Sequence, residues 1–221
     1  MSLPRLSGPS AAPASGGPAR QLVVMLHGVG SDGQDLIDLA PFVAEALPDA
    51  AFVAPNAPFA FDMATGGHQW FSLQVRSSDA IIGGVRQAAP ILDAYLDEML
   101  AEHGLGEDAL ALVGFSQGAM MALHVALRRT KPVAAVVAYS GALPDPEVLP
   151  AEITARPRVL LVHGEEDQVV NPLCLPLAER TLASVGVPVM AEMRKGLGHG
   201  IDGHGARLGR EFLRQALDPT P

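Results

Sequence analysis

Hydrophobic residues occur along this chain in short continuous runs, separated by longer stretches in which apolar and polar residues mix. Six runs have the length of a strand, and they cover residues 21–27, 51–55, 109–115, 133–140, 158–163 and 187–193. A strand has a continuous apolar sequence of this kind when both of its faces are buried, as in a parallel sheet that helices cover on both sides. The runs therefore predict the strands of a parallel sheet.

Between these runs, apolar residues recur at the three- and four-residue spacing of a helix. The spacing predicts helices over residues 35–47, 80–102, 119–127, 173–185 and 203–217. Pro48 should end the first helix. Asp79 is expected to cap the second, Pro90 to bend it and Gly104 to close it. Strands and helices alternate with short connections, which predicts an α/β fold with a mostly parallel central sheet and helices on both faces.

Residues 1–19 differ from the rest, because they consist almost entirely of Ser, Gly, Pro, Ala and Leu. Such a composition cannot bury enough surface to offset the entropy of ordering, so we expect a flexible leader. The remaining residues, 20–221, form one alternating pattern without an internal repeat. Their length suits a single α/β domain.

One long stretch, residues 56–76, fits neither pattern. It contains Pro58, a pair of glycines and four of the ten aromatic residues of the chain. Two interpretations stay open. The stretch is either a loop held on the surface by its own side chains or an apolar wall for a substrate, since long loops in compact domains are often functional. The wall would consist of Phe59, Phe61, Met63, Trp70 and Phe71.

Composition excludes several classes of function. The formal net charge is −9 and no basic cluster exceeds Arg128, Arg129 and Lys131, which argues against nucleic acid as a partner. No apolar run approaches the roughly 18 residues that span a bilayer, so we expect no stable membrane insertion. The single cysteine, Cys174, excludes an internal disulfide and favours a cytoplasmic location. No pattern indicates a metal, a cofactor or an oligomeric state.

The strand over residues 109–115 ends in Gly114-Phe-Ser-Gln-Gly118 and passes directly into the next helix. A Gly-x-Ser-x-Gly turn in this context pushes the serine hydroxyl out at the carboxyl end of the strand, and its glycines avoid collisions there. Ser116 is therefore a candidate nucleophile. A serine hydroxyl is a poor nucleophile by itself and needs a base within hydrogen-bond distance.

Two later strand ends supply the groups that such a serine needs. Asp167 follows the strand over residues 158–163, and His199 follows the last strand. The carboxyl ends of strands meet at one edge of an open α/β sheet, and the chain order Ser, Asp, His is that of an α/β-hydrolase. His199 would take the serine proton, and Asp167 would orient the imidazole. The backbone N–H groups of Gln117 and Val29 are candidate donors to the oxyanion.

Other residues compete for these roles. Glu165 and Glu166 are alternatives to Asp167, and His204 is an alternative to His199, although it falls where the last helix should begin. The remaining histidines have structural interpretations, as a core residue (His124), as surface residues (His68, His103) and as hydrogen-bonding residues at strand ends (His27, His163). No His-x-x-x-His pair or cysteine cluster supports a zinc site.

With these motifs placed, the chain resembles the carboxylesterase/phospholipase family of α/β-hydrolases, which includes acyl-protein thioesterases and lysophospholipases. The resemblance runs from about Leu22 to Leu217. It rests on Leu26-His-Gly-Val-Gly30, Ala54-Pro-Asn-Ala-Pro58, Trp70-Phe71, Gly114-Phe-Ser-Gln-Gly118, His163-Gly-x-x-Asp-x-Val-Val170 and Gly198-His199. It implies Ser116, Asp167 and His199 as the catalytic triad, with Val29 and Gln117 as oxyanion donors. It also implies an acyl groove with little or no lid, to which the Trp70-Phe71 segment contributes.

The chain departs from the family pattern at two positions. Ser31 separates Gly30 from Asp32, where many relatives have Gly-Asp directly, and Ala119 stands where a second glycine often follows Ser-Gln-Gly. The resemblance implies a serine hydrolase that cleaves esters, thioesters or lysophospholipids through an acyl-enzyme on Ser116, with a small acyl compound as substrate. Two alternatives stay open: an amidase or peptidase with the same triad, and a non-catalytic binding protein with the hydrolase fold.

Overall fold

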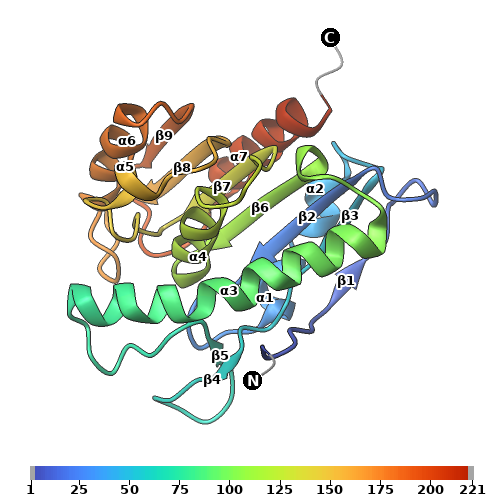
Figure 1. The fold of residues 1–221 in the computed structure, drawn as a ribbon. Helices are drawn as coiled ribbons and strands as arrows, with labels where there is room; N and C mark the ends of the chain where they lie inside the picture. Colours follow the sequence, from blue (N-terminus) through green and yellow to red (C-terminus); the bar gives the residue numbers. More distant parts are fainter. Residues whose placement is uncertain (1–2, 219–221) are drawn as a thin grey trace.

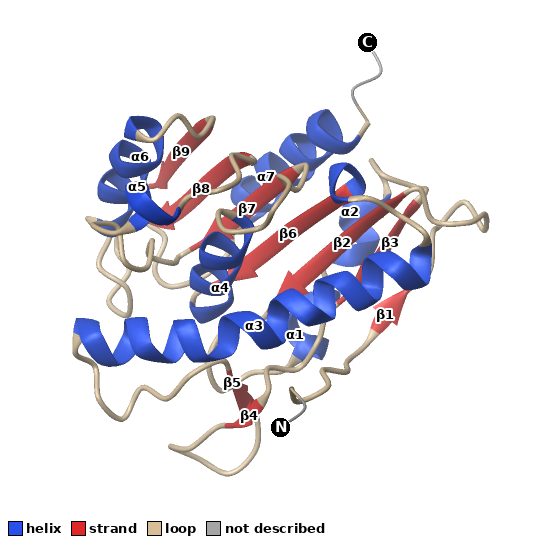
Figure 2. Ribbon diagram, in the orientation of Figure 1, coloured by secondary structure: helices blue, strands red, loops and turns tan. Residues whose placement is uncertain are grey.

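The computed structural model describes residues 3–218 and arranges them around a seven-stranded sheet (Figures 1 and 2). The strand order is β1-β3-β2-β6-β7-β8-β9, and every neighbouring pair is parallel except β1 with β3. The strands are β1 (Ser10–Ala11), β2 (Gln21–Leu26), β3 (Ala50–Val53), β6 (Leu110–Phe115), β7 (Ala135–Tyr139), β8 (Arg158–Gly164) and β9 (Val189–Arg194). All six runs predicted as strands lie in this sheet, which confirms the predicted α/β class.

Helices cover both faces of the sheet. They are α1 (Gly33–Ile37), α2 (Ala40–Ala44), α3 (Ser78–His103), α4 (Gln117–Ala126), α5 (Leu149–Glu152), α6 (Cys174–Ser184) and α7 (Gly203–Leu217), with a 3₁₀ turn at Glu107–Ala109. Apolar side chains of α3, α4 and α6 pack on one face, and those of α1, α2 and α7 pack on the other. Strand β2 serves both layers, because Leu22 and Val24 face the first and Val23 and Met25 face the second. Two-sided burial explains its unbroken apolar run.

Two helix boundaries differ from the prediction. The single helix expected over residues 35–47 is split into α1 and α2, because Pro41 has no N–H to continue the hydrogen-bond ladder of α1. Helix α3 begins two residues earlier than expected: Ser77, not Asp79, is its cap, and the Ser77 hydroxyl accepts a hydrogen bond from the N–H of Ala80. Gly104 closes α3 in a left-handed conformation, as predicted.

The amino-terminal segment also differs from the prediction of a flexible leader. In its described part, Ser10 and Ala11 pair antiparallel with β3, and the Leu6 side chain is only 7% exposed. Residues 1–2 lie outside the described part. The free edge of β3 offers backbone groups that pair with any extended segment, whatever its side chains. Composition reflects side-chain burial and not backbone pairing, so it does not predict this strand.

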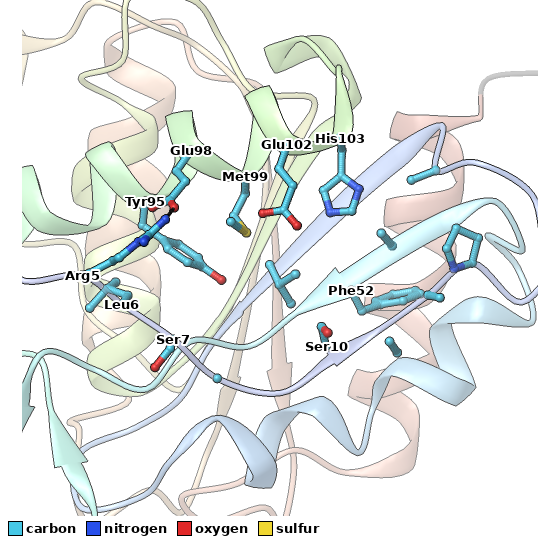
Figure 3. A pocket seen from close by; sticks show the side chains of 17 residues that line it. Arg5, Leu6, Ser7, Ser10, Phe52, Tyr95, Glu98, Met99, Glu102 and His103 are labelled. Carbon is cyan, nitrogen blue, oxygen red and sulfur yellow. Dashed lines mark hydrogen bonds and ion pairs between the residues drawn. The ribbon is translucent and has the colours of Figure 1, made fainter.

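A cavity of about 440 Å³ lies between this segment, β3 and the carboxyl-terminal half of α3 (Figure 3). An ion pair between Arg5 and Glu98 lies at its edge, and Tyr95, Glu102 and His103 also line it. Burial is the main reason that the pKa of Tyr95 is raised to about 12. None of the candidate site residues lines this cavity.

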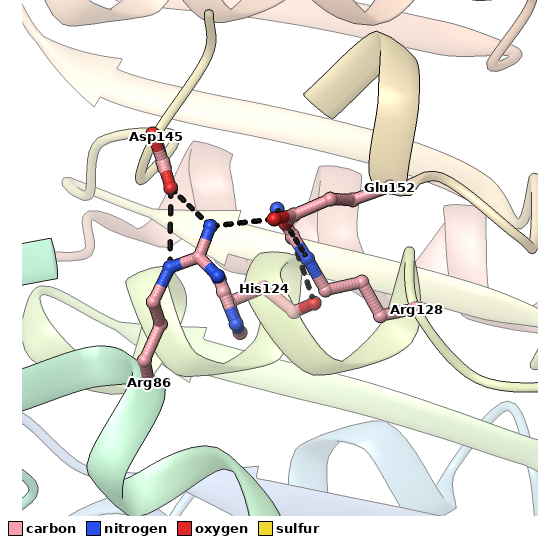
Figure 4. A network of polar contacts seen from close by, with 5 residues as sticks. All are labelled: Arg86, His124, Arg128, Asp145 and Glu152. Atoms are coloured by element: carbon pink, nitrogen blue, oxygen red, sulfur yellow. Dashed lines mark hydrogen bonds and ion pairs between the residues drawn. The ribbon is translucent and has the colours of Figure 1, made fainter. Parts of the chain in front are cut away.

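A network of ion pairs fixes the irregular segment between β7 and β8 to the helices on the same face (Figure 4). Arg86 of α3 contacts Asp145 and Glu152, and Arg128 of α4 binds the same Glu152. His124 lies beside this network and is 4% exposed, as expected for a core histidine, but its buried Nδ1 atom has no hydrogen-bond partner among the described residues, contrary to the expectation of a satisfied side chain. Burial, followed by the nearby guanidinium groups, lowers its pKa to about 4, so His124 is neutral at neutral pH.

Candidate active site

Ser116 occupies the sharp turn between β6 and α4. Its φ of 52° and ψ of −114° are strained for a residue with a side chain. The turn is close-packed: a Cβ added to Gly118 would lie 1.9 Å from the carbonyl oxygen of Leu26. The N–H of Ser116 donates to the carbonyl oxygen of Tyr139 at 2.9 Å. These contacts hold the serine in a conformation that places its hydroxyl at the carboxyl edge of the sheet.

The structure brings the three predicted proton-transfer residues together at that edge. The Nε2 atom of His199 lies 3.0 Å from Oγ of Ser116, and Nδ1 of His199 lies 2.7 Å from Oδ2 of Asp167. Asp167 comes from the loop after β8 and His199 from the loop between β9 and α7. The chain separations of 83 and 32 residues are closed by the parallel order of β6, β7, β8 and β9.

Asp167 is buried and has hydrogen-bond partners on both carboxylate oxygens. Its Oδ1 atom accepts from the N–H groups of Val169 at 2.8 Å and Val170 at 2.9 Å. Burial acts to raise the pKa of Asp167, but the bonds from His199, Val170 and Val169 outweigh it and lower that pKa below its usual range. The ionised carboxylate requires a proton on Nδ1 of His199. The Nε2 atom of the neutral imidazole is then free to accept the Ser116 proton.

The rival residues lie outside this arrangement. His204 is half exposed in α7, and its Nε2 atom lies 3.8 Å from a carboxylate oxygen of Glu192. The side chains of Glu165 and Glu166 are exposed, and their backbone N–H groups bond to the strand and loop that precede His199. The geometry therefore unites Ser116 with His199 and Asp167, and with none of their competitors.

An ion pair that the sequence analysis did not identify closes the loop that carries His199. Arg194, at the end of β9, binds Asp202 through Nη2 at 3.0 Å, and Asp202 caps α7 by accepting from the N–H of Gly205 at 2.7 Å. The Arg194 guanidinium is the first cause of a lowered pKa at Asp202. In addition, the Ser140 hydroxyl donates to the carbonyl oxygen of Gly200 at 3.4 Å. The loop is thus held at both ends.

The two candidate oxyanion donors have unpaired N–H groups within the described residues. Gln117 is the first residue of α4, where backbone N–H groups have no partner inside the helix. Val29 follows Gly28, and a Cβ added to Gly28 would lie 3.4 Å from Cβ of Ser116. Both donors therefore belong to segments that pack directly around the serine.

The glycine-rich loop after β2 takes a defined path despite the extra residue at Ser31. Ser31 pairs with His68: the N–H of His68 donates to the Ser31 carbonyl at 2.8 Å, and the N–H of Gly30 donates to the His68 carbonyl at 2.8 Å. The ring of His68 lies 3.1 Å from the carbonyl oxygen of Ala57 through Nδ1. His68, expected at the surface, is half-buried and ties this loop to the β4–β5 hairpin, formed by Phe59–Ala60 and His68–Gln69.

Trp70 does not line a substrate groove, contrary to the prediction. Its side chain is 0% exposed, and its indole N–H donates to the carbonyl oxygen of His27 at 3.0 Å. The Gln117 side chain accepts from the N–H of Trp70 at 2.8 Å and donates to the carbonyl oxygen of Phe71 at 2.7 Å. Trp70 therefore braces the two segments that carry the candidate oxyanion donors.

The other predicted wall residues are divided between two environments. Phe59 and Phe71 line a cavity of about 470 Å³, together with glutamine side chains from the same loop and from α3. The Phe61 ring packs over Gly30, and Met63 is 53% exposed. The long loop is thus partly a surface hairpin and partly a cavity wall, so each of the two open interpretations describes part of it.

His27 has the structural role expected from its place at the end of β2. Its Nε2 atom accepts from the N–H of Ala57 at 2.9 Å, and Nδ1 donates to the carbonyl oxygen of Gly28 at 2.7 Å. Burial lowers the pKa of His27. Within residues 3–218, no group of three or more His, Cys, Asp and Glu residues is placed to hold a metal ion. No helix in that range is long and apolar enough to cross a membrane.

Comparison with known proteins places the chain among esterases. Esterase YpfH of Escherichia coli strain K12 is 29% identical over 200 residues, which cover 90% of this chain and 84% of that protein. Acyl-protein thioesterase 1 homolog 1 of Dictyostelium discoideum is 26% identical over 203 residues, covering 88% of this chain and 90% of that protein.

Solved structures agree with these relatives. The crystal structure of esterase PE8 matches with a TM-score of 0.93 at 43% identity, over 96% of this chain and all of that chain. A carboxylesterase from Mesorhizobium loti matches with a TM-score of 0.73 at 25% identity, over 90% of this chain and 91% of that chain. The model of the family described as phospholipase/carboxylesterase matches residues 10–217. The chain therefore belongs to the phospholipase/carboxylesterase family of α/β-hydrolases.

Proposed function

We propose that Ser116, His199 and Asp167 are the nucleophile, the general base and the orienting acid of this carboxylesterase, a serine hydrolase that cleaves carboxylic esters or thioesters. The observation that carries the assignment is the unbroken chain of contacts from Ser116 Oγ through the imidazole of His199 to the buried carboxylate of Asp167. The names of the relatives favour an ester or thioester over an amide or peptide bond and disfavour a non-catalytic role.

The reaction follows from the positions of the protons. Oγ of Ser116 attacks the acyl carbon while its proton moves to Nε2 of His199, and Asp167 stabilises the imidazolium that forms. The oxyanion of the tetrahedral intermediate accepts hydrogen bonds from the N–H groups of Val29 and Gln117. His199 then returns the proton to the departing alcohol or thiol, which leaves the acyl group on Ser116. A water molecule, deprotonated by His199, releases the acid and regenerates the serine.

The acyl group is proposed to extend toward the cavity that Phe59 and Phe71 line. Its volume of about 470 Å³ lies within the range of small-molecule sites. Gln69, Gln74 and Gln87 also line it, and their amide groups can form hydrogen bonds with a polar group of the substrate. We also propose a cytoplasmic location, which rests on the single unpaired cysteine, Cys174. Cell fractionation with an antibody to the protein tests that location.

Replacement of Ser116 by alanine tests the assignment. The turn is held by glycines and by the backbone N–H of Ser116, so the variant should keep its fold. We expect kcat for p-nitrophenyl butyrate to fall on the order of 10⁴- to 10⁶-fold, and labelling by a fluorophosphonate probe to disappear. Ser140→Ala is the matched control, because Ser140 directly follows the neighbouring strand and also has a positive φ. The Ser140→Ala variant should still be labelled by the probe at Ser116. Labelling that survives in Ser116→Ala would remove this serine from the mechanism.

A further inference from the structure

A second histidine touches the carboxylate that orients His199. His163 lies near the end of β8 and is 1% exposed. Its Nε2 atom lies 3.2 Å from Oδ2 of Asp167 and 3.0 Å from the carbonyl oxygen of Val170. His163 takes no part in the proton transfers between Ser116 and His199.

The two neighbours determine where the proton of His163 lies. A carboxylate oxygen and a carbonyl oxygen are both acceptors, so Nε2 must be the protonated ring nitrogen. Without that proton, three lone pairs would face one another in a buried site, which is costly. Nε2 of His163 therefore donates a hydrogen bond to the carbonyl oxygen of Val170, and this protonated nitrogen also lies 3.2 Å from Oδ2 of Asp167.

This contact adds to the set around Asp167. Oδ1 accepts from the N–H groups of Val169 and Val170, and Oδ2 accepts from Nδ1 of His199 and lies 3.2 Å from the protonated Nε2 of His163. The two histidines share a single oxygen, so each reduces the negative charge that the other experiences.

We propose that His163 is a positioning residue that sets the basicity of His199 by sharing Oδ2 of Asp167. The inference rests on the proposed function, because it assumes that His199 is the base. Without the His163 donor, Oδ2 would keep more negative charge for His199 and would stabilise its imidazolium. The histidine would then lose its proton at a higher pH. A residue that only filled space would not have this effect.

The other ionisable groups near the pair do not supply the same interaction. Cys174, at the start of α6, has a pKa raised by burial and then by the charge of Asp167. Glu165 and Glu166 share the loop of Asp167, but their side chains are exposed. The side of His199 next to β6 meets the uncharged ring of Phe115, with ring centroids 4.8 Å apart. Among the described residues, only His199 and His163 bring a side-chain nitrogen next to the Asp167 carboxylate, at 2.7 Å and 3.2 Å.

The test is the pH dependence of kcat/KM for p-nitrophenyl butyrate in two variants and one control. In His163→Leu, the acidic limb should move to higher pH by roughly half a unit or more, because the polar N–H beside the charged carboxylate is lost. In His163→Gln, the amide nitrogen restores a donor near the position of Nε2, and the limb should return toward that of the unsubstituted protein. His124→Leu removes another buried histidine that does not contact Asp167, and its limb should not move. An unmoved limb in folded His163→Leu, or a limb that His163→Gln fails to restore, overturns the proposal.

A second measurement decides the question if His163→Leu does not fold. In the unsubstituted protein labelled with ¹⁵N-histidine, NMR should show His163 with its proton on Nε2 throughout the pH range of activity. A proton on Nδ1 alone would overturn the proposal, because no donor would then face Asp167. This readout does not depend on catalysis. Retained activity in Ser116→Ala would instead contradict the proposed function, so the two failures are distinguishable.

Discussion

Ser116 illustrates how a single residue stores strain where the chemistry occurs. A residue with a side chain in such a conformation costs on the order of 1 to 3 kcal/mol, and the surrounding structure must supply it. Ala119 stands where many relatives have glycine, and its methyl group fits because the residue opposite is Gly141. A Cβ added to Gly141 would lie only 2.6 Å from Cβ of Ala119. The extra methyl group is thus accommodated by a neighbouring glycine, and the turn keeps its geometry.

The choice between the two nearby histidines leads to a prediction at this scale. An ordinary imidazole carries an extra proton below roughly pH 6 to 7 and cannot act as a base in that form. Activity should therefore rise as the pH increases through this range. The lowered pKa of Asp167 means that its carboxylate stays charged over the whole limb, so we expect a single ionisation. His199→Ala should abolish hydrolysis, and His204→Ala should leave the profile unchanged. If His204→Ala abolished hydrolysis and His199→Ala did not, His204 would be the base. A second ionisation in the acidic limb of the pH profile would show that Asp167 titrates as well.

At the scale of elements, the site is built from four segments that meet at one edge of the sheet. The turn before α4 brings the nucleophile, and the loops after β8, β9 and β2 bring the acid, the base and one oxyanion donor. Trp70 lies behind them as a brace, and the Arg194–Asp202 pair closes the loop of His199. All four segments are turns or loops, so the precision of the site depends on contacts between them.

The different surroundings of Trp70 and Phe59 allow a direct test of the acyl wall. If the cavity holds the acyl chain, each buried methylene should gain up to about 0.8 kcal/mol, and kcat/KM should rise from acetate to octanoate esters until the cavity is full. Phe59→Ala should flatten that rise. Trp70→Ala should instead lower kcat/KM for all esters alike and destabilise the fold by about 3 to 5 kcal/mol, because a fully buried ring is lost. Parallel chain-length profiles for Phe59→Ala and the unsubstituted protein would exclude this cavity as the acyl site.

At the scale of the whole molecule, the amino-terminal segment completes the sheet at the edge farthest from β9. It covers the edge of β3 and adds Leu6 to the core, while the candidate active site lies at the carboxyl ends of the central strands. Stability and catalysis are therefore served by different parts of the molecule.

Deletion of residues 2–12 should lower the stability of the protein without changing its catalytic efficiency. Loss of the buried Leu6 side chain alone should lower the free energy of unfolding by roughly 2 kcal/mol, and the bared edge of β3 should promote association. The kcat/KM of the remaining monomer should be unchanged. Urea unfolding and light scattering measure the first two effects, and deletion of residues 2–4, which leaves Leu6 and β1 in place, is the control. Full stability in the longer deletion would mean that the segment contributes nothing to the fold.

The sequence by itself determined the six parallel strands and the main helices between them, the α/β class and the Gly-x-Ser-x-Gly turn, because apolar runs, helical spacing and glycine positions are local properties of the chain. It also supplied Asp167 and His199 as candidates, since each follows a strand in a fixed order. Only the tertiary structure decided what depends on side-chain direction or on pairing between distant segments. Trp70 turned inward because its indole N–H finds the carbonyl oxygen of His27, 43 residues away. The amino-terminal segment became a strand because β3 offered it a free edge, and His163 reached Asp167 because the loop after β8 folds back onto its own strand.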